Sequence, residues 1–134
     1  SIGNSAPDFI LDESSLKRLS TLDVAENYIL VFWSSGCSHC LKELPQLHSL
    51  SDKLNSTKYK VVAVGLEENY AKWSNEVKKF PNFINTIKLQ KWDNKVVKDY
   101  ALTSTPTYFV LDQDKKFKFK PEGLIDLKAY LNKE

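Results

Sequence analysis

The feature that most constrains the fold is an unbroken apolar run from Tyr28 to Trp33, which leads after a short polar stretch into a leucine-rich segment. An apolar run of this length is typical of a central strand covered on both faces. Pro45 lies inside the leucine-rich segment and is expected to kink it, because proline lacks a backbone donor. The segment itself has the three- and four-residue spacing of an amphipathic helix, formed by Leu41, Leu44, Leu47, Leu50 and Leu54.

The alternation of strands and helices continues along the chain, without linkers, repeats or low-complexity tracts. We predict an α/β fold in which a mixed central β-sheet is flanked by helices on both faces, in one domain that spans residues 1–134. The turn before the last predicted strand lacks glycine, so Asp114 or Lys115 is expected to take a left-handed backbone conformation. The further predicted strands are 9–11, 59–66, 86–89, 107–111 and 117–119, and the further predicted helices are 14–22, 69–80, 94–102 and 124–131.

Size and charge exclude several classes of protein. With 134 residues the chain can bury a core without disulfide bridges. Its 19 basic and 17 acidic residues give a net charge of +2, and Arg18 is its only arginine, so a nucleic-acid partner is not expected. No apolar run is long enough for a transmembrane segment, and residues 1–5 lack the pattern of a signal peptide.

Cys37 and Cys40 are the only cysteines, and just Ser38 and His39 separate them. A disulfide between them would close so small a loop that it would stabilise the fold little. Cys37 is predicted at the N-terminus of the leucine-rich helix, where unpaired amides and the helix dipole favour an anion. A thiolate is such an anion, and it is the attacking species in disulfide exchange. Cys40, within the first turn, is positioned to resolve a mixed disulfide on Cys37, so the pair predicts dithiol–disulfide exchange.

His39 is expected to tune the two cysteines. A cationic imidazole could donate a hydrogen bond to the Cys37 sulfur, stabilise the thiolate and make the disulfide more oxidising. The alternative is an exposed helix residue without such a contact. A zinc site is another interpretation of the cysteine pair, but a tetrahedral site needs about four ligands, and only His39 and His48 could join the pair. We therefore expect neither a metal nor a cofactor.

Three stretches together resemble the TlpA/ResA branch of the thioredoxin superfamily. The first spans 30–45 and contains the cysteine pair followed by Glu43-Leu44-Pro45, the second is 6–9, and the third is 104–112 with Thr105-Pro106-Thr107. The resemblance runs in order from about residue 6 to the final helix and implies a thioredoxin-like fold. It also implies a cis Thr105–Pro106 bond facing the cysteines, with the Thr105 backbone pairing with an extended substrate segment.

Glu43 has two interpretations. It lies one helical turn after Cys40, and the resemblance implies a glutamate that assists proton transfer, either by raising the pKa of Cys40 or by accepting its proton. Glu43 also follows His39 at the i,i+4 spacing, so the two side chains could form a simple ion pair. Thioredoxins have a buried aspartate near the cysteines, but Val31 occupies that position here.

The chain also departs from these relatives. Gly36 stands directly before the first cysteine, where most of them have tryptophan. The missing ring is expected to open the surface beside Cys37 and to alter the contacts with substrate. Trp33 could line the same site, or it could belong to the core.

These residues predict an oxidoreductase that exchanges disulfides with protein thiol substrates, works with a membrane-bound or soluble redox partner, and is a monomer. The resemblance implies an extracytoplasmic setting, often with a membrane tether upstream, and reduction of particular protein disulfides, although the direction of electron flow stays open. Three alternatives are kept. A peroxiredoxin would need an arginine near its reactive cysteine, a copper-handling domain would need a histidine after His48, and a binding module would leave the pair idle.

Overall fold

The computed structural model describes residues 1–134, and a mixed five-stranded sheet lies at its centre in the order β5-β4-β3-β6-β7. β3 is parallel to β4, and β4 is parallel to β5, whereas β6 runs antiparallel to both of its neighbours. Every residue of the central strand is buried, as its unbroken apolar run predicts. The strands are β3 (Asn27–Trp33), β4 (Tyr59–Leu66), β5 (Ile84–Lys88), β6 (Thr107–Asp112) and β7 (Phe117–Phe119).

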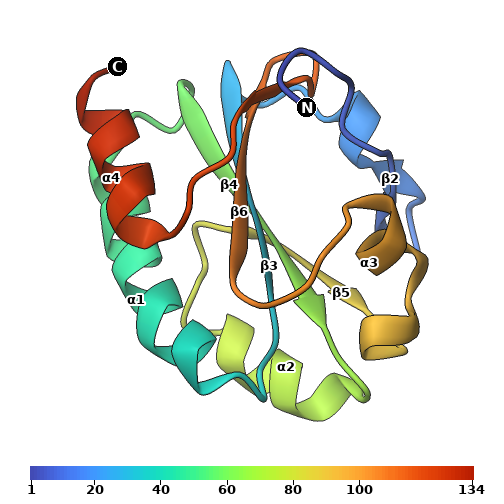
Figure 1. Cartoon of the computed structure of the whole chain (residues 1–134). Helices are drawn as coiled ribbons and strands as arrows, with labels where there is room; N and C mark the ends of the chain where they lie inside the picture. The colour runs from blue at the N-terminus through green and yellow to red at the C-terminus, as the bar shows by residue number, and fades with distance from the viewer.

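Helices cover both faces of this sheet, which confirms the predicted fold (Figure 1). One face packs against α1 (Ser38–Lys53), α2 (Tyr70–Val77) and α4 (Leu124–Asn132), and we call it the α1 face. The other packs against α3 (Lys95–Asp99) and the N-terminal segments, and we call it the α3 face. β3 serves both faces because successive side chains of a strand point to opposite sides. Its residues Ile29, Val31 and Trp33 belong to the α1 face, and Tyr28, Leu30 and Phe32 to the α3 face.

The helix predicted over 14–22 is wrong. This stretch contains instead the short strand β2 (Lys17–Arg18) and a 3-10 turn, η1 (Leu19–Thr21). β2 pairs antiparallel with the preceding strand β1 (Ile10–Asp12). The reason is local turn chemistry, because the Asp12 carboxylate accepts hydrogen bonds from the Ser14 amide, at 3.0 Å, and from the hydroxyls of Ser14 and Ser15. Leu16 then takes a left-handed conformation with φ 56°. Side chains that bond to nearby backbone in this way compete with a helix.

Other boundaries differ more modestly. α2 ends at Val77, and α3 spans only Lys95–Asp99 because Ala101 turns left-handed with φ 51°. A further 3-10 turn, η2 (Lys91–Asp93), follows β5 and was not predicted. Lys115 has φ 63°, which confirms the expected left-handed residue in the last hairpin. α1 is continuous across Pro45. None of the helices combines the length and apolar character that crossing a membrane requires.

Candidate active site

Cys37 occupies the N-cap of α1, directly after the loop that leaves β3. Its backbone is extended, and its sulfur accepts a hydrogen bond from the Cys40 amide at 3.1 Å. The Cys37 amide in turn donates to the Ser34 carbonyl at 3.1 Å. The sulfur thus takes the position of a capping oxygen, where the first unpaired amides of the helix favour a negative charge. This is the location that the sequence predicts for the attacking thiol.

The two thiols are free and lie in different environments. Burial alone would raise the pKa of Cys37, but hydrogen bonds from the Cys40 thiol, the Thr105 side chain and the amides of Cys40 and His39 outweigh it and lower that pKa below 9.0. Cys40 is fully buried, and burial, followed by its hydrogen bond with Cys37, raises the pKa of Cys40 to about 12. The pair therefore combines one thiol that ionises readily with one that holds its proton.

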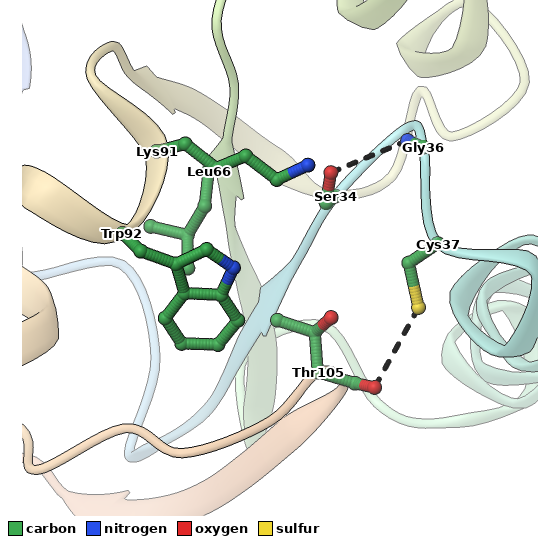
Figure 2. Close-up of a pocket in the computed structure, with 7 residues that line it drawn as sticks. All are labelled: Ser34, Gly36, Cys37, Leu66, Lys91, Trp92 and Thr105. Atoms are coloured by element: carbon green, nitrogen blue, oxygen red, sulfur yellow. Dashed lines mark hydrogen bonds between the residues drawn. The ribbon is translucent and has the colours of Figure 1, made fainter.

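Thr105 and Pro106 come from the segment before β6 and lie beside the reactive sulfur. The peptide bond between them is cis. The Cys37 thiol donates to the Thr105 carbonyl, with 3.5 Å between sulfur and oxygen (Figure 2). Residues far apart in sequence thus meet at the start of α1, as the resemblance implies.

His39 and Glu43 bond to each other through their side chains, which is the i,i+4 contact that the sequence predicts. The His39 ring, with 66% of its side chain exposed, bonds to this carboxylate and not to the Cys37 sulfur, which receives support from the His39 amide instead. The other Glu43 oxygen accepts a hydrogen bond from the Tyr108 hydroxyl at 2.6 Å. Burial, with the neighbouring Glu43 carboxylate, raises the pKa of Tyr108.

Two polar residues of this region were missed by the sequence interpretation. Tyr108 was assigned only to a strand, although a hydroxyl on a buried strand needs a partner. Glu67 directly follows β4 and is buried, and its carboxylate accepts hydrogen bonds from the Ser35 amide at 2.8 Å and the Ser35 hydroxyl at 2.6 Å. Its position was the available signal, since the carboxyl ends of parallel strands commonly carry functional groups. Glu67 holds the loop that leads into Cys37.

A pocket of about 110 Å³ opens beside Cys37 (Figure 2). Gly36 lines it, so the absent ring does leave open surface next to the thiol. Trp33 does not contribute, because it is fully buried and packs edge-to-face on Phe80 with 6.1 Å between ring centroids. Of the two interpretations of Trp33, the structure supports the core and not the substrate contact, since the inward face of β3 carries this ring into the core. The pocket is lined by Ser34, Gly36, Cys37, Leu66, Lys91, Trp92 and Thr105.

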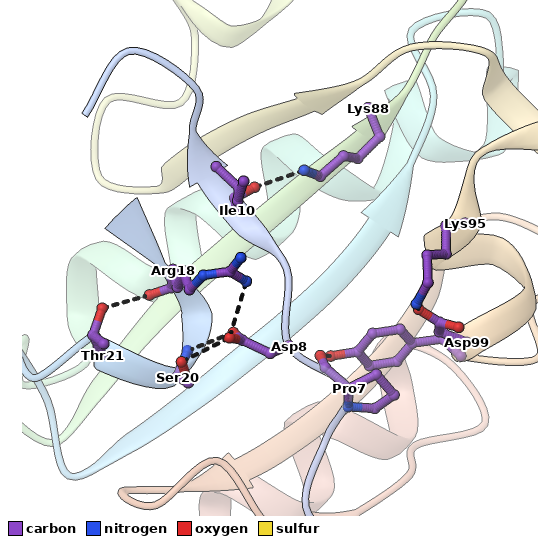
Figure 3. A network of polar contacts seen from close by, with 10 residues as sticks. Pro7, Asp8, Ile10, Arg18, Ser20, Thr21, Lys88, Lys95 and Asp99 are labelled. Atoms are coloured by element: carbon purple, nitrogen blue, oxygen red, sulfur yellow. Dashed lines mark hydrogen bonds and ion pairs between the residues drawn. The ribbon is translucent and has the colours of Figure 1, made fainter. Parts of the chain in front are cut away.

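The residues that the alternative functions would need lie elsewhere. Arg18, on β2, pairs with Asp8 at 3.2 Å and not with a cysteine (Figure 3). His48 accepts a hydrogen bond from the Asn82 amide at 3.2 Å and packs on aromatic rings of the α1 face. No three side chains of the histidine, cysteine, aspartate and glutamate types gather closely enough to form a metal-binding group.

Comparison with known sequences points to disulfide chemistry. ResA, named a thiol-disulfide oxidoreductase, is 29% identical to this chain in Bacillus cereus over 86% of the chain, and 27% identical in Bacillus subtilis over 85%. The chain spans about two thirds of the length of these curated relatives, 66% and 63% respectively.

Solved structures agree on the fold. A domain of a possible thiol-disulfide isomerase from Cytophaga hutchinsonii superposes with a TM-score of 0.84 at 26% identity, covering 99% of this chain and 92% of that one. A putative thiol:disulfide interchange protein DsbE from Chlorobium tepidum has the same fold, with a TM-score of 0.81 at 24% identity over 98% and 94% of the two chains. A family model described as thioredoxin-like matches residues 26–117. The sheet order, the cysteine pair at the start of α1 and this match agree that the chain belongs to the thioredoxin-like family.

Proposed function

We propose that the chain is a thiol–disulfide oxidoreductase that reduces disulfides of protein substrates through Cys37 and Cys40. The observation that carries this proposal is the asymmetry of the two thiols, one partly exposed with a lowered pKa and one buried with a raised pKa. A nucleophile needs thiolate character and access, whereas a resolving thiol must wait until the mixed disulfide has formed. ResA and similar relatives, which are named for this chemistry, support the proposal.

The reaction proceeds in two steps, formation of a mixed disulfide and its resolution. The Cys37 thiolate attacks one sulfur of the substrate disulfide, so that the substrate S–S bond breaks, a Cys37–substrate disulfide forms and the other substrate sulfur leaves as a thiolate. Cys40 then loses its proton and attacks the Cys37 sulfur, which releases the second substrate thiolate. Two electrons pass to the substrate, whose thiolates take up protons, and a disulfide joins Cys37 and Cys40. A dithiol partner protein reduces that disulfide in the reverse sequence.

Glu43 is the group that we propose accepts the Cys40 proton. It lies one turn further along α1 and therefore on the same helix face, and Tyr108 and His39 fix the orientation of its two carboxylate oxygens. A positioned carboxylate of this kind acts as a general base when it is within reach of the proton. His39 then acts on the thiols through Glu43, as a positioning residue.

The substrate segment adds to the protein as an extended strand beside Thr105 and Pro106, next to Gly36. This mode is supported by the Thr105 carbonyl, which points at the Cys37 sulfur from 3.5 Å and lines the open pocket. Hydrogen bonds between the backbone of a substrate and the backbone at Thr105 give affinity without requiring one particular substrate sequence. We place the protein outside the cytoplasm, in the periplasm or cell envelope, by analogy with its relatives.

Reduction of insulin by dithiothreitol tests the proposal. The wild-type protein is expected to accelerate precipitation of the insulin B chain, and Cys37→Ser to abolish the acceleration because no attacking thiolate is left. Cys40→Ser provides the matched control, since it should retain the first step and accumulate a mixed disulfide that mass spectrometry detects. Equal activity of wild-type and Cys37→Ser proteins would refute the proposed chemistry.

A further inference from the structure

The pocket beside Cys37 contains two residues that disulfide exchange alone does not require. Lys91 and Trp92 belong to η2, which follows the edge strand β5, whereas the cysteines lie at the start of α1. Both residues nevertheless line the pocket together with Gly36 and Cys37. Figure 2 shows the Lys91 side chain extending over the pocket towards Ser34, with the Trp92 ring forming the wall opposite Cys37.

The position of Lys91 is fixed by the fold. Its amide donates to the Glu67 carbonyl at 3.1 Å, and both Gln90 and Lys91 take left-handed conformations, with φ 70° and 45°. A Cβ atom built on Gly36 would lie 4.0 Å from the Lys91 Nζ atom. The ammonium therefore lies at contact distance from the first atom of any side chain at position 36, and a large side chain there would cover it.

Lys91 forms no ion pair with a carboxylate of the protein, since its ammonium takes part in none of the five ion pairs of the molecule. Glu67 and Glu68 line a neighbouring pocket together with Lys72 and Lys91 itself, but neither forms an ion pair with Lys91. Glu67 instead accepts hydrogen bonds from the Ser35 amide and hydroxyl. A partly buried ammonium without a partner favours an anion from outside the protein, because charge-assisted hydrogen bonds are strong in such surroundings.

We propose that this pocket is a substrate subsite, formed by Gly36, Lys91 and Trp92, that accepts an acidic side chain flanking the cysteine attacked by Cys37. The inference rests on the proposed function and adds a preference for one class of protein disulfide. At about 110 Å³ the pocket accommodates a short side chain and not a folded segment. The Trp92 ring, 41% exposed, covers the methylene groups of an aspartate or glutamate, while Lys91 binds its carboxylate.

The experiment uses disulfide-linked dimers of short capped peptides, Asp-Cys-Asp, Asn-Cys-Asn and Lys-Cys-Lys. Each dimer is mixed with reduced Cys40→Ser protein, and mass spectrometry follows formation of the mixed disulfide on Cys37. Each rate is divided by the rate of the same dimer with 2-mercaptoethanol, which removes differences in the peptides' own reactivity. The Asp dimer is expected to react about fivefold faster than the Lys dimer at low salt, a size typical of one partly exposed ion pair.

Three further variants test which residues create the preference. In the same background, Lys91→Glu should invert it, and Gly36→Trp should remove it by filling the pocket. Lys53→Glu makes the same change of charge at the C-terminal end of α1. This end lies about 24 Å from the start of the helix, where Cys37 is, by the rise of a 16-residue helix. The variant should therefore leave the preference intact. If the Cys40→Ser protein ranks the peptides alike with and without Lys91→Glu, or if Lys53→Glu changes the ranking as much as Lys91→Glu, the subsite does not exist.

The two proposals fail in different ways. A protein that reduces insulin but ranks the three peptides equally retains the proposed function and loses the subsite. A protein that reduces neither insulin nor any peptide overturns the proposed function and the subsite with it.

Discussion

Both faces of the sheet bury polar groups, but the groups have different kinds of partner. On the α1 face the Tyr108 hydroxyl bonds to the Glu43 carboxylate, which bonds to the His39 ring. On the α3 face the partners are backbone carbonyls. Tyr100 donates to Pro7 at 2.5 Å, and Lys88 donates to Ile10 at 2.6 Å (Figure 3). A carbonyl keeps one state at every ordinary pH, whereas a carboxylate and an imidazole can exchange protons. The comparison is the basis of the proposal that the α1 network takes part in the chemistry, whereas the α3 network is expected to contribute stability alone.

The largest expected effect is the difference in alkylation rate between the two cysteines, Cys37 and Cys40. At pH 8, iodoacetamide should alkylate Cys37 at least about 100-fold faster than Cys40, because the pKa of Cys37 is lowered and that of Cys40 is raised to about 12. The Cys37 rate should rise with pH and reach half its maximum below pH 9.0, while Cys40 stays unreactive until far above it. Peptide mapping of the labelled protein gives both rates.

Protein unfolded in urea provides the control for this measurement. The two rates should then agree within about twofold, because both cysteines return to the ordinary thiol pKa. Unequal rates in urea, or equal rates in the folded protein, would contradict the proposed assignment of nucleophile and resolving thiol.

A matched pair of tyrosine variants compares the two faces directly. Tyr108→Phe removes the hydroxyl that orients Glu43 and should slow insulin reduction about tenfold, since a general base loses efficiency when it is misplaced. Tyr100→Phe removes a hydroxyl that bonds to a carbonyl and should leave the rate unchanged. Each should lower the free energy of unfolding by about 1 kcal/mol. Equal effects of the two changes on the rate would remove the functional distinction between the faces.

Glu67 is expected to affect both the stability of the fold and the reactivity of Cys37, because it is a buried carboxylate that holds the loop before Cys37. Glu67→Gln keeps the shape of the side chain but weakens its charge-assisted hydrogen bonds to Ser35. We expect the free energy of unfolding to fall by about 1–2 kcal/mol and alkylation of Cys37 to become slower. Urea denaturation measures the first effect, and an unchanged transition would show that the loop does not depend on this carboxylate.

The smallest expected effect lies on the α3 face. Burial would raise the pKa of Asp8, but hydrogen bonds from the Ser20 amide and hydroxyl, and then from Phe9 and Arg18, lower it below 3.8. A lowered pKa contributes stability above pH 3.8 that is lost as the pH falls through the folded value. Asp8→Asn should therefore cost about 0.5 kcal/mol at pH 7 and less at pH 3, with insulin reduction unaffected. A loss of activity in this variant would show that the α3 face does participate in the chemistry.

The sequence predicted best those parts of the molecule that depend on local pattern. The unbroken apolar run of β3 and the leucine stripe of α1 leave few alternatives, so the sheet, the main helix and the place of Cys37 could be recognised. The helix expected near Ser14 failed because an aspartate and two serines formed a turn through their side chains. Hydrogen bonds of that kind outweigh a weak helical pattern in a short segment.

The remaining parts of the site depend on which strands become neighbours. Tyr108 reaches Glu43 only because β6 pairs with β3, and Lys91 approaches Gly36 only because η2 follows β5 at the edge of the sheet. Neither contact leaves a periodic signal along the chain. Trp33 illustrates the reverse case, since its nearness to the cysteines in sequence suggested a site residue, while strand alternation directs it into the core.

The distance in sequence between Cys37 and Thr105 has a consequence for the life of the protein. The hydrogen bonds from Cys40 and His39 that lower the pKa of Cys37 come from the same helix, whereas the one from the Thr105 side chain comes from a segment 68 residues further along the chain. The helix start can therefore form before the rest of the sheet, but Cys37 has its full set of partners only after β6 has paired with β3. The reactivity of this one sulfur thus reports on local helix formation first and on the assembled sheet second.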